Sequence, residues 1–183
     1  MPVIKQREQR VGVFLDVQNL YHSAKHLYHG GRVNFKELLK AAVAGRKLIR
    51  ALAYVVKTET VEEQAFFEAL TKSGIELKIK DLQVFPGGLK KGDWDVGLAV
   101  DTIRLAPALD AVVLVSGDGD FVPLLEYLKN SGGVQVEVMA FGRSASARLR
   151  EAADEFVDLS EDPDKFIIPA KPKSYTGFLK WNK

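Results

Sequence analysis

The chain has 183 residues, of which 46% are hydrophobic and 27% are charged; this is enough for one well-packed soluble α/β domain and short for two. No apolar run approaches the roughly 20 residues that span a bilayer, and the opening MPVIKQREQR lacks the apolar core of a signal peptide, so we expect a cytoplasmic protein with no membrane partner. The net charge is +2, and the absence of cysteine excludes disulfides and thiolate metal sites.

The predicted elements alternate between strands and helices along the chain. The segments VGVFLDV and AVVLVSG are apolar on both sides of the pleat, which is typical of buried parallel strands. IELKIKDLQVF alternates apolar and polar residues and so predicts a strand nearer the sheet edge. We expect strands at 11–17, 48–56, 75–85, 111–117, 134–141 and 155–159, and helices at 19–28, 35–44, 62–74, 95–105, 121–129 and 144–154. Asn19 and Asn34 are candidate helix caps, and the alternation predicts a parallel sheet with helices on both faces.

The charge is unevenly distributed, and this suggests three segments. Residues 169–183 contain four lysines and no acid, so they supply more than the whole net charge of +2. We predict an N-terminal extension (1–10), a single domain (11–168) and a basic tail (169–183). Such a tail could touch phosphates or be a solvated, disordered end.

Acidic residues follow two of the buried strands. Asp16 ends the first strand, and Asp118 and Asp120 follow the strand at 111–117. Ligands of open parallel sheets bind outside the carboxyl ends of the strands, where the strand order reverses. If these two strands are neighbours, the three aspartates converge on one crevice.

The helix at 95–105 carries two further candidates, Asp95 and Asp101. Their six-residue spacing places them about 120° apart around a helix. At most one of them should point into the crevice, and we favour Asp95, because it starts the helix.

Clustered carboxylates repel one another and raise each other's pKa, and a divalent cation removes that cost. The ion can acidify a water molecule and stabilise charge on a phosphoryl oxygen. Oxygen ligands favour Mg²⁺ or Mn²⁺. Asn19 could orient a water or a phosphate through its amide, and Lys90 and Lys91, in the glycine-rich basic loop at 86–93, could contact a backbone phosphate.

Each of these features also has a simpler explanation. An aspartate after a strand usually caps the next helix, and Asp118-Gly-Asp120 alone could be a turn plus a cap. The KKGD sequence alone could be a solvated turn. Trp94 could stack on bases or anchor the core or a loop. A shared polar helix face explains three histidines better than metal ligation does: His22, His26 and His29.

In combination, the motifs resemble those of NYN domains, and most closely the LabA-like bacterial branch. VFLDVQNLY is similar to the family's opening motif, KKGDWDVGLAVD to its middle motif, and VVLVSGDGDFVPLLEYLKNSG to its third. SARLREAADEFVDL resembles the closing helix and strand. The resemblance covers about residues 10–160, in the expected order.

This resemblance implies a PIN-like three-layer α/β/α fold whose parallel core has the strand order 3-2-1-4-5. It also implies Mg²⁺- or Mn²⁺-dependent cleavage of RNA. By motif, the main metal-binding carboxylates are Asp16, Asp95 and Asp118, and the supporting positions are Asn19, Asp101 and Asp120, of which Asp120 also supports the metal.

The middle motif departs from the family pattern. Two residues, Asp93 and Trp94, stand between the glycine and Asp95, where the family usually has one. Whether Asp93 or Asp95 is the metal ligand is therefore open.

The sequence favours a nuclease that leaves a 3′-hydroxyl and a 5′-phosphate, acting on single-stranded rather than paired RNA. The alternative is a non-catalytic RNA-binding or regulatory module on the same fold. A haloacid dehalogenase-type phosphatase needs a second aspartate where this chain has Gln18, a Toprim domain needs a glutamate in place of Asp16, and a dinucleotide site needs a glycine-rich first turn. The RNA sequence, the pathway and any homo-oligomeric state are left open.

Overall fold

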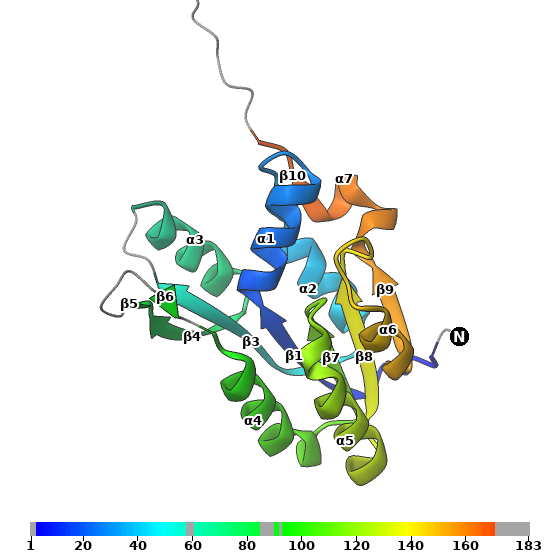
Figure 1. Ribbon diagram of the computed structural model, residues 1–183. Coiled ribbons are helices and arrows are strands. Elements are labelled where there is room, and N and C mark those ends of the chain that lie inside the picture. Colours follow the sequence, from blue (N-terminus) through cyan, green and yellow to red (C-terminus); the bar gives the residue numbers. More distant parts are fainter. Residues whose placement is uncertain (1–2, 58–60, 85–89, 92, 171–183) are drawn as a thin grey trace, which may run out of the picture.

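A six-stranded parallel sheet forms the centre of the molecule (Figure 1). The computed structural model describes residues 3–57, 61–84, 90–91 and 93–170. The strand order is β4-β3-β1-β7-β8-β9, and all neighbours run parallel. The predicted core order is confirmed, and the predicted last strand extends it. The strands are β1 (Arg10–Asp16), β3 (Lys47–Lys57), β4 (Glu76–Asp81), β7 (Ala111–Val115), β8 (Gln135–Ala140) and β9 (Glu155–Asp158).

Helices cover both faces of this sheet, because the central strands are apolar on both sides. In β1, Val13 and Leu15 belong to one core and Phe14 to the other, and all three are fully buried. One core includes residues of α1 (Val17–Leu27), α2 (Phe35–Val43), α3 (Val61–Lys72) and α7 (Pro163–Phe166). The other includes residues of α4 (Asp95–Leu105), α5 (Val122–Gly132) and α6 (Ala147–Ala152). The three-layer α/β/α prediction is confirmed. None of the helices in the described ranges is long and apolar enough to cross a membrane.

Short elements complete the fold. Two antiparallel pairs lie outside the main sheet: β2 (Arg32–Val33) with β10 (Ile167–Ile168), and β5 (Gln83–Val84) with β6 (Lys90–Lys91). Three 3₁₀ turns follow helices or strands: η1 (Ala106–Ala108), η2 (Gly119–Phe121) and η3 (Leu159–Glu161). The predicted strand at 75–85 is divided, because β4 ends at Asp81 and the chain then leaves the main sheet as β5.

Two predictions about α1 are wrong, and both errors concern its ends. Asp16, not Asn19, is the N-cap: its carboxylate accepts a hydrogen bond from the Asn19 backbone N–H, and the helix begins at Val17. The helix ends at Leu27, so His29, which has a φ of 48°, does not share a helix face with His22. The predicted cap of α2 is confirmed, since Asn34 accepts from the Glu37 backbone.

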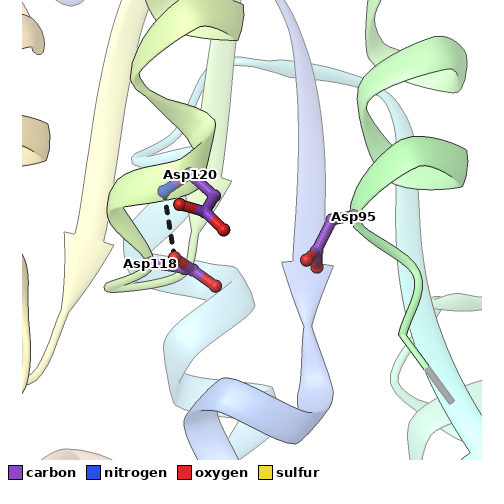
Figure 2. A group of neighbouring side chains, drawn as sticks. All are labelled: Asp95, Asp118 and Asp120. Atoms are coloured by element: carbon purple, nitrogen blue, oxygen red, sulfur yellow. Dashed lines mark hydrogen bonds between the residues drawn. The ribbon is translucent and has the colours of Figure 1, made fainter. Parts of the chain in front are cut away.

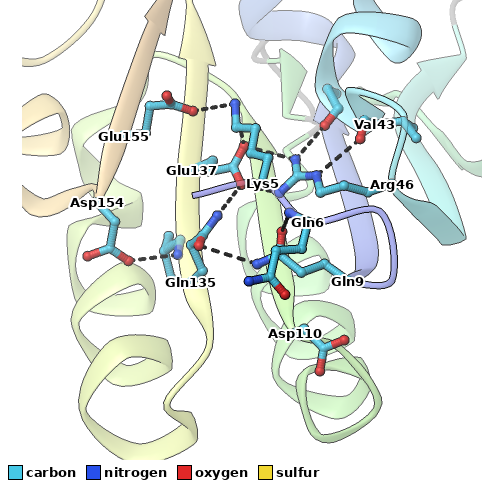
Figure 3. A network of polar contacts seen from close by, with 12 residues as sticks. Lys5, Gln6, Gln9, Val43, Arg46, Asp110, Gln135, Glu137, Asp154 and Glu155 are labelled. Carbon is cyan, nitrogen blue, oxygen red and sulfur yellow. Dashed lines mark hydrogen bonds and ion pairs between the residues drawn. The ribbon is translucent and has the colours of Figure 1, made fainter. Parts of the chain in front are cut away.

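A buried polar network ties the N-terminal segment to the sheet (Figure 3). Arg46 and Glu137 are about 1% and 2% exposed and are joined by two hydrogen bonds of 2.5 and 3.0 Å. Arg46 also donates to the backbone carbonyls of residues 42 and 43. Lys5 lies 3.3 Å from Glu137 and also pairs with Glu155. Residues before β1 therefore contribute to the fold, and the domain limits at 11 and 168 stay a prediction.

Candidate metal centre

Three carboxylates from two elements meet at the carboxyl edge of the sheet (Figure 2). Asp95 is the first residue of α4, and Asp118 and Asp120 follow β7. One oxygen atom from each lies within 4.8 Å of the others. Mg²⁺ and Ca²⁺ hold oxygen ligands at about 2.0–2.6 Å, so oxygens on opposite sides of one ion are about 4.0–5.2 Å apart. The three side chains therefore fit a single hard cation.

The loop after β7 is tight, and its glycine is required by a close backbone approach. A Cβ on Gly117 would lie 3.0 Å from the Ala145 Cα and 3.3 Å from the Ser144 carbonyl oxygen. The Gly117 carbonyl accepts from the Ser146 backbone N–H at 2.9 Å. Asp118 caps η2 by accepting from the Asp120 backbone N–H at 3.0 Å. The turn-plus-cap explanation is thus correct, and the same turn brings both aspartates beside Asp95.

Asp16 lies beside this group but is not one of the three. Its Oδ1 accepts from the Asn19 backbone at 3.1 Å, and its Oδ2 accepts from the Ser116 hydroxyl at 3.0 Å. Burial raises the pKa of the Asp16 carboxyl, and the nearby charge of Asp118 adds to that rise, against the hydrogen bonds that lower it. Both oxygens are held in place, so Asp16 presents a fixed negative charge to the cluster.

Asn19 connects the two strand ends. Its Oδ1 accepts from the Gly117 backbone N–H at 2.9 Å. The predicted role was to orient a water or a phosphate, but the oxygen of the amide is already used to position the loop after β7. Ser116, which the sequence reasoning did not single out, makes the matching bond from that loop to Asp16. Its position directly before Gly-Asp-Gly-Asp was the available signal.

Within the described part of the chain, the charge of the cluster is not balanced by an ion pair. Among the residues that the structure describes, no lysine or arginine forms an ion pair with Asp95, Asp118 or Asp120. Burial is the main cause that raises the pKa of Asp95 to about 6, followed by the charges of Asp16 and Asp118. Uncompensated, partly buried carboxylates cost stability, and this is typical of sites that hold a cation.

Asp95→Asn is expected to raise the free energy of unfolding at pH 8 in EDTA and to leave it nearly unchanged below about pH 4. The folded-state pKa of Asp95 is raised to about 6. In the wild type, the contribution of the Asp95 carboxyl to the free energy of unfolding is therefore fully present below the unfolded-state pKa. It is lost as the pH rises through about 6, because the folded protein must then hold a charged carboxylate in an unfavourable place. Urea denaturation across a pH series measures the difference.

The matched control is Asp164→Asn in α7, which removes an exposed carboxylate. It should give no such pH-dependent difference. If the folded cluster binds Mn²⁺, the ion at pH 8 should raise the Tm of the wild type more than that of Asp95→Asn. If Asp95→Asn raises the free energy of unfolding by the same amount at pH 4 and pH 8, the charge of Asp95 is not the cause of the difference.

Asp101 lies away from the three-carboxylate group. Its Oδ2 accepts from the Tyr54 hydroxyl at 3.1 Å and lies 3.6 Å from Lys78, and Arg104 approaches its other oxygen at 3.9 Å. The divergence of Asp95 and Asp101 around the helix is as predicted. Tyr54 was not predicted; the signal was a tyrosine within the apolar run ALAYVV of β3. Burial, followed by the charge of Asp101, raises its pKa.

The middle motif left open whether Asp93 or Asp95 joins the site. In the structure, Asp95 belongs to the group of three carboxylates and Asp93 does not. Asp93 is exposed, and its carbonyl accepts from Lys80 at 3.2 Å. Trp94 anchors the start of α4: its indole N–H donates to the Val55 carbonyl at 2.9 Å, and its ring packs edge-on against Tyr54. The loop-anchor explanation of Trp94 therefore holds. Three predicted features lie outside the described residues. They are the side chains of Lys90 and Lys91, residues 86–89 of the glycine-rich loop, and the tail beyond residue 170.

Comparison with known proteins agrees with this architecture. A family model described as NYN domain matches residues 10–160. Over 164 residues the chain is 24% identical to "Low amplitude and bright protein LabA" of Synechococcus elongatus, covering 85% of this chain and 86% of that protein. A solved structure of a protein of unknown function from Vibrio parahaemolyticus is 30% identical with a TM-score of 0.81, covering 91% of this chain and all of that one. The matched region runs from the first strand to the turn after β9 and includes Asp16, Asp95, Asp101, Asp118 and Asp120, so the chain belongs to the NYN domain family.

Proposed function

We propose that this protein is a metal-dependent nuclease that hydrolyses phosphodiester bonds of RNA, and more specifically an endoribonuclease acting on single strands. The observation that carries the proposal is the set of three carboxylates from the start of α4 and the loop after β7, with oxygens within 4.8 Å of one another. The family assignment supports a nucleic-acid substrate, since NYN domains have a nuclease-type fold.

The donor set fits Mg²⁺ or Mn²⁺. All three grouped ligands are carboxylates, and the chain has no cysteine, so the site matches hard cations and not a thiolate-bound one. In this proposal Asp95, Asp118 and Asp120 hold the ion, and Asp16 adds the fourth negative charge. When bound, the ion acidifies water and stabilises charge on the phosphoryl group.

The remaining residues would keep this geometry fixed. Asn19 and Ser116 hold the end of β1 and the loop after β7 at a constant separation. Trp94 and its bond to β3 hold the start of α4, and with it Asp95. Asp120 is the most exposed of the three carboxylates, and so it would face the substrate. A rigid arrangement of this kind is what positioning of a reacting phosphate requires.

The direct test uses purified protein and an end-labelled single-stranded RNA. Cleavage should need Mn²⁺ or Mg²⁺, stop with EDTA, return with excess Mn²⁺, and leave 5′-phosphate ends. Parallel reactions with duplex RNA and with single-stranded DNA of the same sequence define the substrate class. Cleavage that persists in EDTA would overturn the proposal. RNA binding without cleavage under every metal condition would favour the non-catalytic RNA-binding module instead.

A further inference from the structure

A second feature lies on the same face of the sheet as α4. A cavity of about 200 Å³ opens between this helix and strands β3 and β4. Its lining brings together three cations and one carboxylate: Arg50, Lys78, Arg104 and Asp101, with Leu52 and Leu105 as the apolar part. We call this set of six residues the basic pocket. It lies outside the carboxylate cluster, and nothing in the proposed metal chemistry uses it.

The cations of the basic pocket are only partly neutralised. Lys78 and Arg104 lie 3.6 and 3.9 Å from Asp101. These separations are too long for good hydrogen bonds, so their N–H donors remain available to a ligand. Arg50 makes two hydrogen bonds to Glu76, through Nε and one terminal nitrogen. Among the described residues, and with Glu76 counted, three cations face two carboxylates, which leaves one positive charge for a singly charged anion.

The basic pocket is connected to the carboxylate cluster along one face of β4. Alternate residues of a strand share a face, so Lys80 lies on the same side of the sheet as Lys78. The Lys80 ammonium donates to the Asp93 carbonyl at 3.2 Å and lies 5.7 Å from the Trp94 ring centre. Along α4, Asp101 is six residues from Asp95, or about 9 Å along the helix axis. Lys80, beside the start of α4, and Lys78, in the basic pocket, therefore place positive charge along one face of β4.

The size of the cavity indicates a small ligand. Pockets for drug-sized molecules and cofactors usually measure about 300–1,000 Å³, so 200 Å³ suits a phosphate group better than a whole nucleotide. The unneutralised positive charge excludes a cation. The neighbouring acidic cluster repels a polyanion, so a nucleic-acid strand needs a cationic contact close by.

We propose that the basic pocket binds a backbone phosphate of the same single-stranded RNA whose scissile bond lies at the carboxylate cluster. The inference rests on the proposed function and adds the path of the substrate. Lys78 and Arg104 contact this phosphate, and Lys80 lies along the path between the two sites. The pocket therefore sets how the strand is positioned, while the acids carry the chemistry.

The test compares two double variants that each remove two positive charges. Lys78→Gln with Arg104→Gln alters the basic pocket. Lys40→Gln with Lys72→Gln is the control, on helices that pack on the opposite face of the sheet. The match is close, because Lys40–Glu37 and Arg104–Asp101 are both i,i+3 pairs at 3.9 Å whose cations are 76% exposed.

RNA binding is measured first, in EDTA, by fluorescence anisotropy of a labelled single-stranded RNA across a salt series. The pocket variant should bind about tenfold more weakly at low salt. Its log–log salt slope should fall by about 0.7, since the pocket holds one phosphate and each phosphate contact on single strands contributes about 0.7. The control variant should match the wild type. Inorganic phosphate should compete weakly; competition as strong as that of the RNA would assign the pocket to free anions and overturn the proposal.

Cleavage is measured second, with Mn²⁺. The pocket variant should raise the KM for the RNA about tenfold with kcat unchanged. It should hydrolyse bis(p-nitrophenyl) phosphate, a diester too short to reach the pocket, at the wild-type rate. The inference would be overturned if the pocket variant lost activity equally on the RNA and on bis(p-nitrophenyl) phosphate. It would also be overturned if the pocket and control variants lost equal activity on the RNA. If the wild type binds RNA through the pocket but never cleaves it, the proposed function fails and the binding inference stands; if the wild type does not bind RNA, the inference fails.

Discussion

Asp118→Asn should lower the rate of RNA cleavage by at least about 100-fold, more than the 10- to 100-fold typical for loss of a partner that only orients a metal ligand. The substitution keeps the size of the side chain, and the amide oxygen can still accept the cap bond from the Asp120 backbone. It removes one of the three charges at the cluster. Because that charge also repels phosphate, RNA affinity in EDTA should be equal or slightly higher.

Cleavage gels and anisotropy on the same preparation separate the two effects. Asp164→Asn, which removes an exposed carboxylate of α7, is the control and should behave as the wild type in both assays. Asp118→Asn therefore binds without cutting, whereas the basic-pocket variant cuts with an unchanged kcat but binds weakly. Wild-type cleavage by Asp118→Asn would show that the carboxylate cluster is not the catalytic centre.

Glu137→Ala should lower the free energy of unfolding by about 3–5 kcal/mol, since it leaves a buried guanidinium without its counter-charge. Glu137 and Arg46 are 2% and 1% exposed, so water cannot replace the lost partner. The Lys5 ammonium at 3.3 Å loses a partner as well. Urea denaturation gives the value, with the m-value as a check that the folded state is otherwise intact.

The chain offers a matched control for this prediction. Arg50 and Glu76 are also joined by two hydrogen bonds, but their side chains are 38% and 51% exposed. Glu76→Ala should cost no more than about 1 kcal/mol, because exposed pairs contribute little. If the two variants lose similar amounts of stability, burial is not what makes the Arg46–Glu137 pair strong.

The architecture of the sheet could be predicted from the sequence because the informative strands are buried on both sides. VGVFLDV and AVVLVSG have no polar face, which fixes them at the centre, and their aspartates come at the carboxyl ends. The strand pattern left the adjacency of β1 and β7 open, and the strand order implied by the resemblance to NYN domains supplied it. Asp118 and Asp120 could therefore be placed near Asp16 without coordinates.

The details that depend on contacts between distant residues could not be predicted. Asp16 and Asn19 are both good cap residues, and the choice depends on where β1 ends. Asp101 could be excluded from the cluster by helix geometry, but its partners come from β3 and β4. Glu137 lies in a strand whose other residues are mostly buried apolar ones, and its partner Arg46 is 91 positions earlier in the chain. No local pattern indicates such a pair.

The bonds between Asn19 and Gly117 and between Ser116 and Asp16 join segments almost 100 residues apart in sequence. Until these segments meet, Asp16 is far from Asp118 and Asp120, and repulsion between their carboxylates does not oppose the formation of the separate elements. Pairing of β7 with β1, a non-local contact of the kind that forms slowly, brings Asp118 and Asp120 beside Asp16. A ribosome-bound chain that ends before β7 carries Asp16 and Asp95 but no cluster. Conversely, an opening that separates β1 from β7 breaks both bonds and takes Asp16 away from Asp118 and Asp120, so cleavage capacity should fall before the helices unfold.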